Sequence, residues 1–300
     1  MGEHASSWGF EEGTQIHEQR RVLASLGGGS RYEVYLAWDE RLFALVVAKL
    51  LRPEVARDEH ALKELRREAE VLERLAHPRL VRGFGAVLDG PHPHLVLEHV
   101  EGPSLRRLVK RHDALSPEQL LPLALELVAV LQYLAGAGHV HLDVKPDNVV
   151  MGVPARLIDL SIARPLEAAA RLRDRIGTDG YMAPEQIEPE RWAGCIGPHT
   201  DVFGLGATLY HAAAGRPPFP RPESARHSPD LEVRFPQLVV EPEPLPASVP
   251  APFARLVMQM LRKDPEDRPA AEECAAALEP IVLAVPTKPT LSRRSGLPVR

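Results

Sequence analysis

The chain changes character near residue 103, and this change limits the possible folds more than any other feature of its sequence. Before that point, residues 32–38 and 43–51 are rich in aromatic and β-branched side chains, which predicts strands. After it, apolar residues recur at helical spacing in four segments, 116–136, 200–214, 251–262 and 270–283. A strand-rich part followed by a helix-rich part predicts an α+β chain with two lobes and a cleft between them.

Charge and cysteine content exclude several classes of function. The net charge of −5 argues against a protein that binds nucleic acid through general electrostatics. Cys195 and Cys274 are the only cysteines and form no CxxC motif, so we expect neither a disulfide framework nor a structural zinc site. This cysteine usage fits a reducing cytoplasm, and the sequence predicts a cytoplasmic protein without a nucleic-acid partner.

The longest apolar run, residues 120–138, raises the question of a membrane span. It contains Pro122, Glu126 and Gln132, which the centre of a bilayer penalises, so we predict a buried helix and no membrane span. The first residues lack the charged and apolar regions of a signal peptide. Met1 and Gly2 begin a match to the N-myristoylation pattern, which is short enough to occur by chance.

Two charged residues occupy positions where apolar ones are expected. Residues 58–76 predict a helix with an apolar stripe formed by Leu62, Leu65, Ala69, Leu72 and Ala76. Glu68 falls on this stripe, and Lys49 lies near the end of the apolar strand 43–51. Both side chains could reach solvent, or they could form an ion pair that positions the lysine to hold phosphate. These two residues alone leave the alternatives open.

A polar loop follows the long helix. Residues 139–148 bring the carboxylate of Asp143, the ammonium of Lys145 and the carboxamide of Asn148 within six positions. An apolar hairpin, 149–151 and 156–158, follows and ends at Asp159. Any one of these polar residues could belong to a solvated connection, but the joint spacing HxDxKxxN with a second aspartate sixteen residues after Asp143 is very specific.

In this order the motifs resemble the eukaryotic-like serine/threonine protein kinase family, over about residues 22–284. The resemblance implies an N-terminal extension (1–19), a β-rich N-lobe with one helix (20–98), a hinge (99–102), a larger helical C-lobe (103–284) and a basic disordered tail (285–300). It also implies an enzyme that transfers the γ-phosphate of ATP, with Mg²⁺ or Mn²⁺, to serine or threonine hydroxyls of a protein substrate. A regulatory protein partner is a further expectation.

The resemblance assigns a role to each matching residue. Asp143 is the catalytic base, with Lys145 and Thr178 beside it, and Asn148 and Asp159 are the metal ligands. The residues expected to bind ATP are Leu26, Gly27, Gly28, Gly29, Val34, Lys49, Glu68, Glu98, Val100 and Val150, with Leu97 as gatekeeper. Asp201, Glu185 and Arg268 are expected to be structural, Asp201 as a brace of the catalytic loop and the other two as an ion pair.

The sequence departs from the family pattern in the nucleotide site. Tyr32 replaces the third glycine of the glycine-rich loop, which we expect to reduce backbone freedom and alter phosphate packing. Val47 replaces an alanine above the adenine. Leu160 and Ser161 follow Asp159 in place of phenylalanine and glycine, so the metal ligand survives while the loop loses a glycine.

The activation loop carries the most informative departure. Leu142 replaces the arginine that usually binds a phosphorylated loop, and residues 162–177 contain no serine, threonine or tyrosine. We therefore predict an enzyme that activation-loop phosphorylation does not switch on. Arg164, Arg171, Arg173 and Arg175 are expected to order the loop with local carboxylates instead. Autophosphorylation is expected on the tail, at Thr287, Thr290, Ser292 and Ser295.

Two rival functions remain open from the sequence. A pseudokinase that binds partners without transferring phosphate is suggested by Tyr32 and Ser161. A small-molecule phosphotransferase would share the catalytic aspartates but not the Ala183–Pro184–Glu185 segment, Thr178, Asp201 or Arg268. The sequence names no substrate protein, oligomeric state or activating signal, and since no sensor segment follows residue 300, we expect a partner or the expression level to supply that signal.

Overall fold

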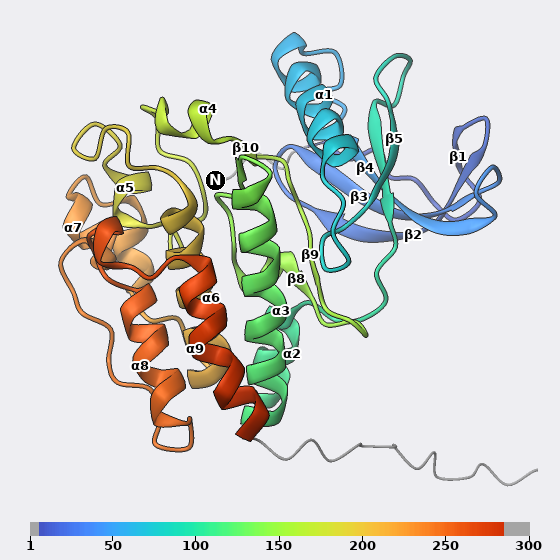
Figure 1. Ribbon diagram of the computed structural model, residues 1–300. Helices are drawn as coiled ribbons and strands as arrows, with labels where there is room; N and C mark the ends of the chain where they lie inside the picture. Colours follow the sequence, from blue (N-terminus) through green and yellow to red (C-terminus); the bar gives the residue numbers. More distant parts are fainter. Residues whose placement is uncertain (1–5, 285–300) are drawn as a thin grey trace, which may run out of the picture.

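The computed structural model describes residues 6–284, and its two parts lie side by side in Figure 1, a twisted sheet with one helix and a larger helical body. The sheet has six antiparallel strands in the order β1-β2-β3-β4-β6-β5. Their bounds are β1 Gln15–His17, β2 Arg20–Gly28, β3 Tyr32–Asp39, β4 Ala44–Leu51, β5 Gly83–Val87 and β6 His94–Glu98. Both strands predicted from composition are present, although β4 begins after Phe43, whose φ of 50° lies outside the strand region.

Helix α1 (Glu59–Arg74) packs against this sheet, as Figure 1 shows. The Asp58 side chain accepts a hydrogen bond from the backbone N–H of Ala61 and so caps the first turn. The helix ends two residues before the predicted limit, so Ala76 is exposed and does not belong to the buried stripe. Gly83 of β5 lets the helix approach closely, because a Cβ atom there would lie 2.8 Å from Cβ of Leu72.

The second body is built around helix α3 (Pro117–Gly136), which begins and ends where the sequence predicts. It packs against α6 (Pro198–Ala214) and α9 (Ala271–Ala284). By length and composition α3 could also cross a membrane, and half of its most apolar window is buried inside the fold. Its contacts with α6 and α9 assign it as the central helix of this body.

Shorter elements complete the helical body and carry the polar loops. They are α2 Leu105–His112, β7 His139–Val140, η1 Pro146–Asn148, β8 Val149–Val150, β9 Arg156–Leu157, β10 Arg164–Pro165, α4 Leu166–Ala170, α5 Pro184–Ile187, α8 Ala251–Met260 and η4 Pro265–Asp267. Strands β8 and β9 pair antiparallel, which confirms the predicted hairpin after Asn148. The proline-rich stretch 217–252 holds three short helical segments, η2 Glu223–His227, α7 Leu231–Arg234 and η3 Pro236–Leu238.

A single apolar core connects the two bodies. It contains Leu65 of α1, Leu95 of β6, Leu127 of α3 and Phe203 of α6, all with at most 1% of their surface exposed. A second core on the other face of the sheet includes Tyr35. Because one core spans both bodies, the residues that face each other across their junction are held in a defined relation.

Candidate active site

Lys49 and Glu68 form the ion pair that the sequence left open. Nζ of Lys49 lies 2.9 and 3.0 Å from the two carboxylate oxygens of Glu68 and 2.7 Å from Oδ1 of Asp159. Glu68 is 1% exposed and Lys49 7%. Burial alone would lower the pKa of Lys49, but the two carboxylates outweigh it and raise that pKa above its usual value. Lys49 is therefore a fixed ammonium between the sheet, α1 and the helical body.

The position of Asp159 is set by its backbone and its neighbours. Its φ is 68°, and Leu160 after it is buried in the common core. Burial would raise the pKa of the Asp159 carboxyl group, but the charge and hydrogen bond of Lys49 lower it well below the usual range. Ser161 needs no left-handed backbone, and its N–H donates to Oδ1 of Asp159 at 3.4 Å. The loss of glycine at position 161 therefore leaves the carboxylate in place.

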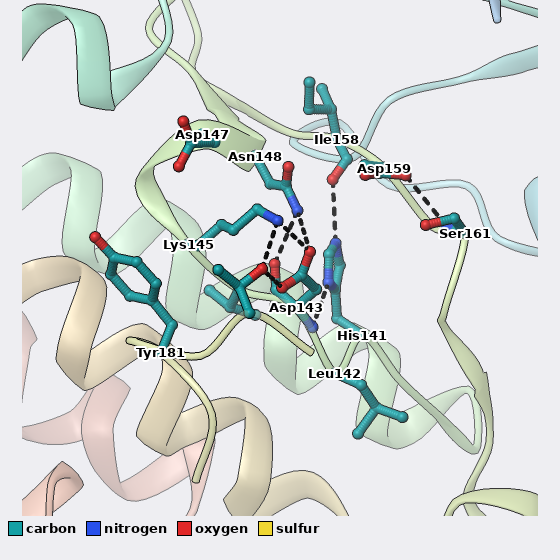
Figure 2. Close-up of polar contacts among 12 residues, drawn as sticks. His141, Leu142, Asp143, Lys145, Asp147, Asn148, Ile158, Asp159, Ser161 and Tyr181 are labelled. Carbon is teal, nitrogen blue, oxygen red and sulfur yellow. Dashed lines mark hydrogen bonds and ion pairs between the residues drawn. The ribbon is translucent and has the colours of Figure 1, made fainter. Parts of the chain in front are cut away.

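Figure 2 shows that Asp143 is the meeting point of the polar loop. Nζ of Lys145 lies 2.6 Å from Oδ2 of Asp143 and 2.7 Å from Oγ1 of Thr178. The Thr178 hydroxyl donates to Oδ1 of Asp143 at 2.7 Å, and Nδ2 of Asn148 donates to Oδ2 at 3.1 Å. Three residues, up to 35 positions away from Asp143 in the sequence, thus contact its carboxylate.

The loop that carries Asp143 is braced from below by Asp201 at the start of α6. The Asp201 carboxylate accepts the backbone N–H groups of His141 and Leu142, each at 2.7 Å. This contact holds Leu142 in a left-handed conformation, with φ of 67°, that a branched side chain rarely adopts. His141 in turn bonds the carbonyl of Ile158 at 3.2 Å, which ties the polar loop to the strand leading into Asp159 (Figure 2).

A cavity of about 340 Å³ lies between the sheet and the helical body, directly above this loop. Its lining is Leu26, Val34, Val47, Lys49, Val81, Leu97, Glu98, His99, Val100, Gly102, Asn148, Val150, Ile158 and Asp159. Every apolar residue that the sequence assigned to an adenine pocket lines it. Val81 and Ile158 were missed, because each lies in a loop or short strand that only the fold brings to the cavity.

The glycine-rich segment, residues 27–29, lies between Leu26 and Val34, which line this cavity, but its glycines are not among the lining residues. Gly27 has a φ of 105°, and a Cβ atom at Gly28 would lie 2.3 Å from the carbonyl oxygen of Tyr32, so both positions need glycine. Tyr32 itself begins β3 and has no positive φ, so a tyrosine adopts this backbone without strain. Its ring lies 4.6 Å from Nζ of Lys49 and adds a cation–π contact to the ammonium.

The loop between Asp159 and Thr178 is held by apolar contacts. Leu142, Val140, Ala169 of α4 and Ile196 form a buried cluster, with four further apolar loop residues packed around it, Ile162, Leu166, Leu172 and Ile176. The prediction that arginines order this loop through carboxylates is wrong for Arg164, Arg173 and Arg175, whose hydrogen bonds go to backbone carbonyls. Arg171 lies 3.7 Å from Glu167, and both side chains are mostly exposed.

The segment after Thr178 is anchored by the predicted ion pair of Glu185 and Arg268, with oxygen–nitrogen distances of 2.6 and 2.8 Å. The sequence did not indicate a further chain of hydrogen-bonded side chains, two members of which, Asp147 and Tyr181, appear in Figure 2. Arg106 donates to Asp147 at 2.6 Å and to the hydroxyl of Tyr181 at 2.9 Å, and that hydroxyl lies 2.7 Å from Nδ1 of His211. Its members come from four separate segments, so no local pattern announces it.

Comparison with known sequences gives the family. Residues 20–277 match the family described as "Protein kinase domain". The chain belongs to the protein kinase family. It is 34% identical over 240 residues to the serine/threonine-protein kinase PkaA of Streptomyces coelicolor, and 31% identical over 257 residues to the serine/threonine-protein kinase PknB of Mycobacterium leprae.

These two matches cover 78% and 81% of the chain but only 42% and 39% of the relatives. The chain therefore spans about two-fifths of the length of the curated relatives it matches. The kinase resemblance and the α+β fold predicted from the sequence are both confirmed. Members of this family generally use ATP and a divalent metal and act on protein substrates. The predicted tail, with its four hydroxyl residues, and the Met1–Gly2 pattern lie outside the described residues.

Proposed function

We propose that this chain is a serine/threonine protein kinase that transfers the γ-phosphate of ATP to hydroxyl groups of a protein substrate. The observation that carries the proposal is the carboxylate of Asp143, which contacts both the Lys145 ammonium and the Thr178 hydroxyl. An acceptor hydroxyl needs a nearby carboxylate to orient it and to take its proton, and a nearby cation to offset charge on the transferred group. Asp143 and Lys145 supply these two groups within 2.6 Å of each other.

The cavity above Asp143 fits the nucleotide. Its walls are mostly apolar, with Leu26, Val34 and Val150 placed to enclose a flat ring and with Glu98 and Val100 also lining it. Lys49 projects into the same cavity with its ammonium fixed by Glu68. A fixed ammonium is suited to hold phosphate oxygens. The N–H groups of Gly27 and Gly29 are bonded within the hairpin, to Oγ of Ser25 at 3.3 Å and to the carbonyl oxygen of Tyr32 at 3.0 Å.

The donor set beside Asp143 fits a hard divalent cation. Asp159 offers a carboxylate, and Asn148 turns its Nδ2 toward Asp143, so its Oδ1 has no hydrogen bond within residues 6–284. Carboxylate and amide oxygens are the ligands that Mg²⁺ and Mn²⁺ prefer. When bound there, the ion neutralises phosphate charge. Lys145 and Asp143 still carry out their roles on the acceptor side through their own contacts.

Activation without loop phosphorylation is part of this proposal. The loop offers no acceptor between residues 162 and 177, and Leu142 belongs to an apolar cluster that holds the loop. The ion pair of Lys49 and Glu68, which aligns α1 with the sheet, is formed by the unphosphorylated chain. Both cysteines are free, in keeping with the cytoplasmic location that we propose from the sequence.

The test is transfer of labelled phosphate from ATP and Mg²⁺ to the chain and to a generic basic protein, beside the variant Asp143→Asn. We expect label on serine or threonine that falls by about a thousandfold in the variant, because general base and positioning effects are lost together. ATP binding without label would support the pseudokinase. Label on an aminoglycoside or another small alcohol, and none on protein, would support the small-molecule phosphotransferase.

A further inference from the structure

Arg52, three residues after Lys49, connects the glycine-rich segment to the N-terminal end of the described chain. Its Nε donates to the carbonyl oxygen of Gly29 at 2.7 Å. Its Nη1 lies 2.8 Å from Oε1 of Glu33 and 2.9 Å from the carbonyl oxygen of Ser6. The Arg52 side chain is 15% exposed, so solvent competes little for these bonds.

Glu33 is the buried centre of this network. It is 4% exposed and accepts hydrogen bonds from the Tyr35 hydroxyl at 2.5 Å, from Arg52 and from the backbone N–H of Trp8. A buried carboxylate with several donors, one of them charged, has a well-defined position. Glu33 therefore fixes the geometry of Arg52 from below.

The N-terminal strap, residues 6–10, lies over this network. Nε1 of Trp8 donates to the carbonyl oxygen of Leu51 at 2.8 Å, and the Trp8 ring stacks on Phe10 with centroids 5.6 Å apart. His92 meets both rings edge-on, and Phe10 packs on Tyr35. These contacts fix the strap on the sheet next to the segment that carries Arg52.

The strap and the nucleotide cavity lie on opposite faces of the same strands. Side chains alternate along β3, so Val34 lines the cavity while Glu33 and Tyr35 point to the other face. Gly29 lies in the hairpin between β2 and β3, where both faces meet. Through the Gly29 carbonyl group, Arg52 on the strap side of the sheet thus restrains the hairpin that borders the cavity.

We propose that Arg52 is a positioning residue for the glycine-rich segment, and that the N-terminal strap keeps Arg52 in place and so adjusts nucleotide affinity from the opposite face of the sheet. The nucleotide effect rests on the proposed kinase function. A segment of consecutive glycines loses much conformational freedom when it closes over phosphates. Anchoring the Gly29 carbonyl beforehand removes part of this loss, which favours binding.

Hydrogen exchange of the nucleotide-free full chain tests the anchor itself. In Arg52→Ala we expect amides of residues 27–32 to exchange about tenfold faster than in the wild type, with α3 unchanged. Arg21→Ala is the matched control, since Arg21 also lies on the sheet but forms an exposed pair with Glu40 at 3.6 Å. Unchanged exchange at residues 27–32 in Arg52→Ala would overturn the proposal.

Kinetics test the consequence for the nucleotide. We expect Arg52→Ala to raise KM for ATP about fivefold to tenfold with kcat changed less than about twofold, because ordering of the segment contributes to binding in ground state and transition state alike. Arg52→Lys should recover part of this effect, since one ammonium can reach one of the three acceptors. A lower kcat at unchanged KM would mean a smaller folded fraction and would contradict positioning.

A double-mutant cycle tests the strap. Trp8→Ala should raise KM for ATP in the same direction, and the double variant Trp8→Ala/Arg52→Ala should equal Arg52→Ala alone, because the strap acts through Arg52. If the increases in KM of the two single variants multiply in the double variant, the strap does not act through Arg52. If Trp8→Ala unfolds, Trp8→Phe removes the bond to Leu51 and keeps the ring stack. A wild type that binds no ATP would refute the proposed function, while hydrogen exchange would still decide the anchor.

Discussion

Arg268 and Glu185 form a bidentate ion pair in which neither side chain has any exposed surface. The guanidinium also donates to the carbonyl oxygens of Arg262, Lys263 and His199, and Thr200 donates to Glu185 at 2.8 Å. The pair therefore joins the segment after Thr178 to the loop before α9, and further hydrogen bonds satisfy both of its charged groups.

The first prediction follows from that pair. Arg268→Met leaves the Glu185 carboxylate buried without its cation, so we expect the free energy of unfolding to fall by about 3 to 5 kcal/mol. Denaturant titration followed by circular dichroism measures this. Arg191→Met removes an exposed arginine paired with Glu188 and should change stability by less than about 0.5 kcal/mol. Equal losses in the two variants would contradict the argument.

The second prediction concerns the partner of Lys49. Glu68→Gln removes one of the two carboxylates that fix the ammonium, so we expect kcat/KM for ATP to fall about tenfold to a hundredfold. Glu70→Gln makes the same change at an exposed position of α1 and should keep wild-type kinetics. Steady-state assays at varied ATP compare the two. Equal activity of both variants would show that Glu68 does not position Lys49.

The third prediction concerns the apolar cluster around Leu142. Leu142→Arg places a cation in the apolar cluster of Val140, Ala169 and Ile196, while the Asp201 carboxylate is already bonded to the backbone of the loop. We expect a loss of about 2 to 4 kcal/mol in stability and lower activity, because the charge is desolvated without a partner. Leu142→Met keeps the volume and should remain within about 1.5 kcal/mol of wild type. Wild-type stability and activity in the Leu142→Arg variant would contradict the role of the cluster.

The fourth prediction is that phosphatase treatment leaves activity unchanged. The loop lacks an acceptor in residues 162–177, and the Thr178 hydroxyl is already bonded to Asp143 and Lys145. A phosphate at Thr178 would place negative charge against the Asp143 carboxylate. Mass spectrometry before and after treatment, with activity measured on the same samples, is the check. Activity that depends on phosphate at Thr178 would refute the prediction.

The fifth prediction is a loss of stability in mild acid. His94 is fully buried and neutral, with its Nε2 3.1 Å from Nη1 of Arg20, and burial together with that arginine lowers its pKa to about 4. The unfolded chain binds this proton below about pH 6.5, so the stabilisation is complete above pH 6.5 and is lost as the pH falls toward 4. At pH 5 the free energy of unfolding is therefore about 2 kcal/mol lower because of this residue.

Urea titrations at pH 7.5 and pH 5 measure that loss. The difference in the free energy of unfolding between the two pH values should be about 2 kcal/mol smaller in His94→Gln, since the variant has no imidazole at this position to titrate. His60→Gln, at an exposed position of α1, should keep the wild-type difference. An unchanged pH dependence in His94→Gln would assign the effect to other groups, with His211, whose pKa burial also lowers to about 4, the next to replace.

Several features of the fold could be predicted because they depend on residues close together in the chain. The Ser116–Pro117 start and Gly136 end of α3 match the structure, as does the hairpin after Asn148. The limit of α1 was predicted two residues too far, since the apolar spacing continues through Ala76 after the helix has ended. Carboxylate partners were predicted for the arginines of the activation loop, whereas Arg164 and Arg175 donate to backbone carbonyl oxygens.

Local spacing was thus enough to predict β3, β4 and the longer helices, the polar loop and the family resemblance, because capping, alternation and motif order act over a few residues. Packing alone decided which groups meet over long separations. Lys49 reaches Asp159 across 110 residues, Leu142 reaches Asp201 across 59, and Glu185 reaches Arg268 across 83. The physical reason is that such pairs form only when strand register, helix packing and burial bring both polar groups to one place and exclude the water that would otherwise solvate them.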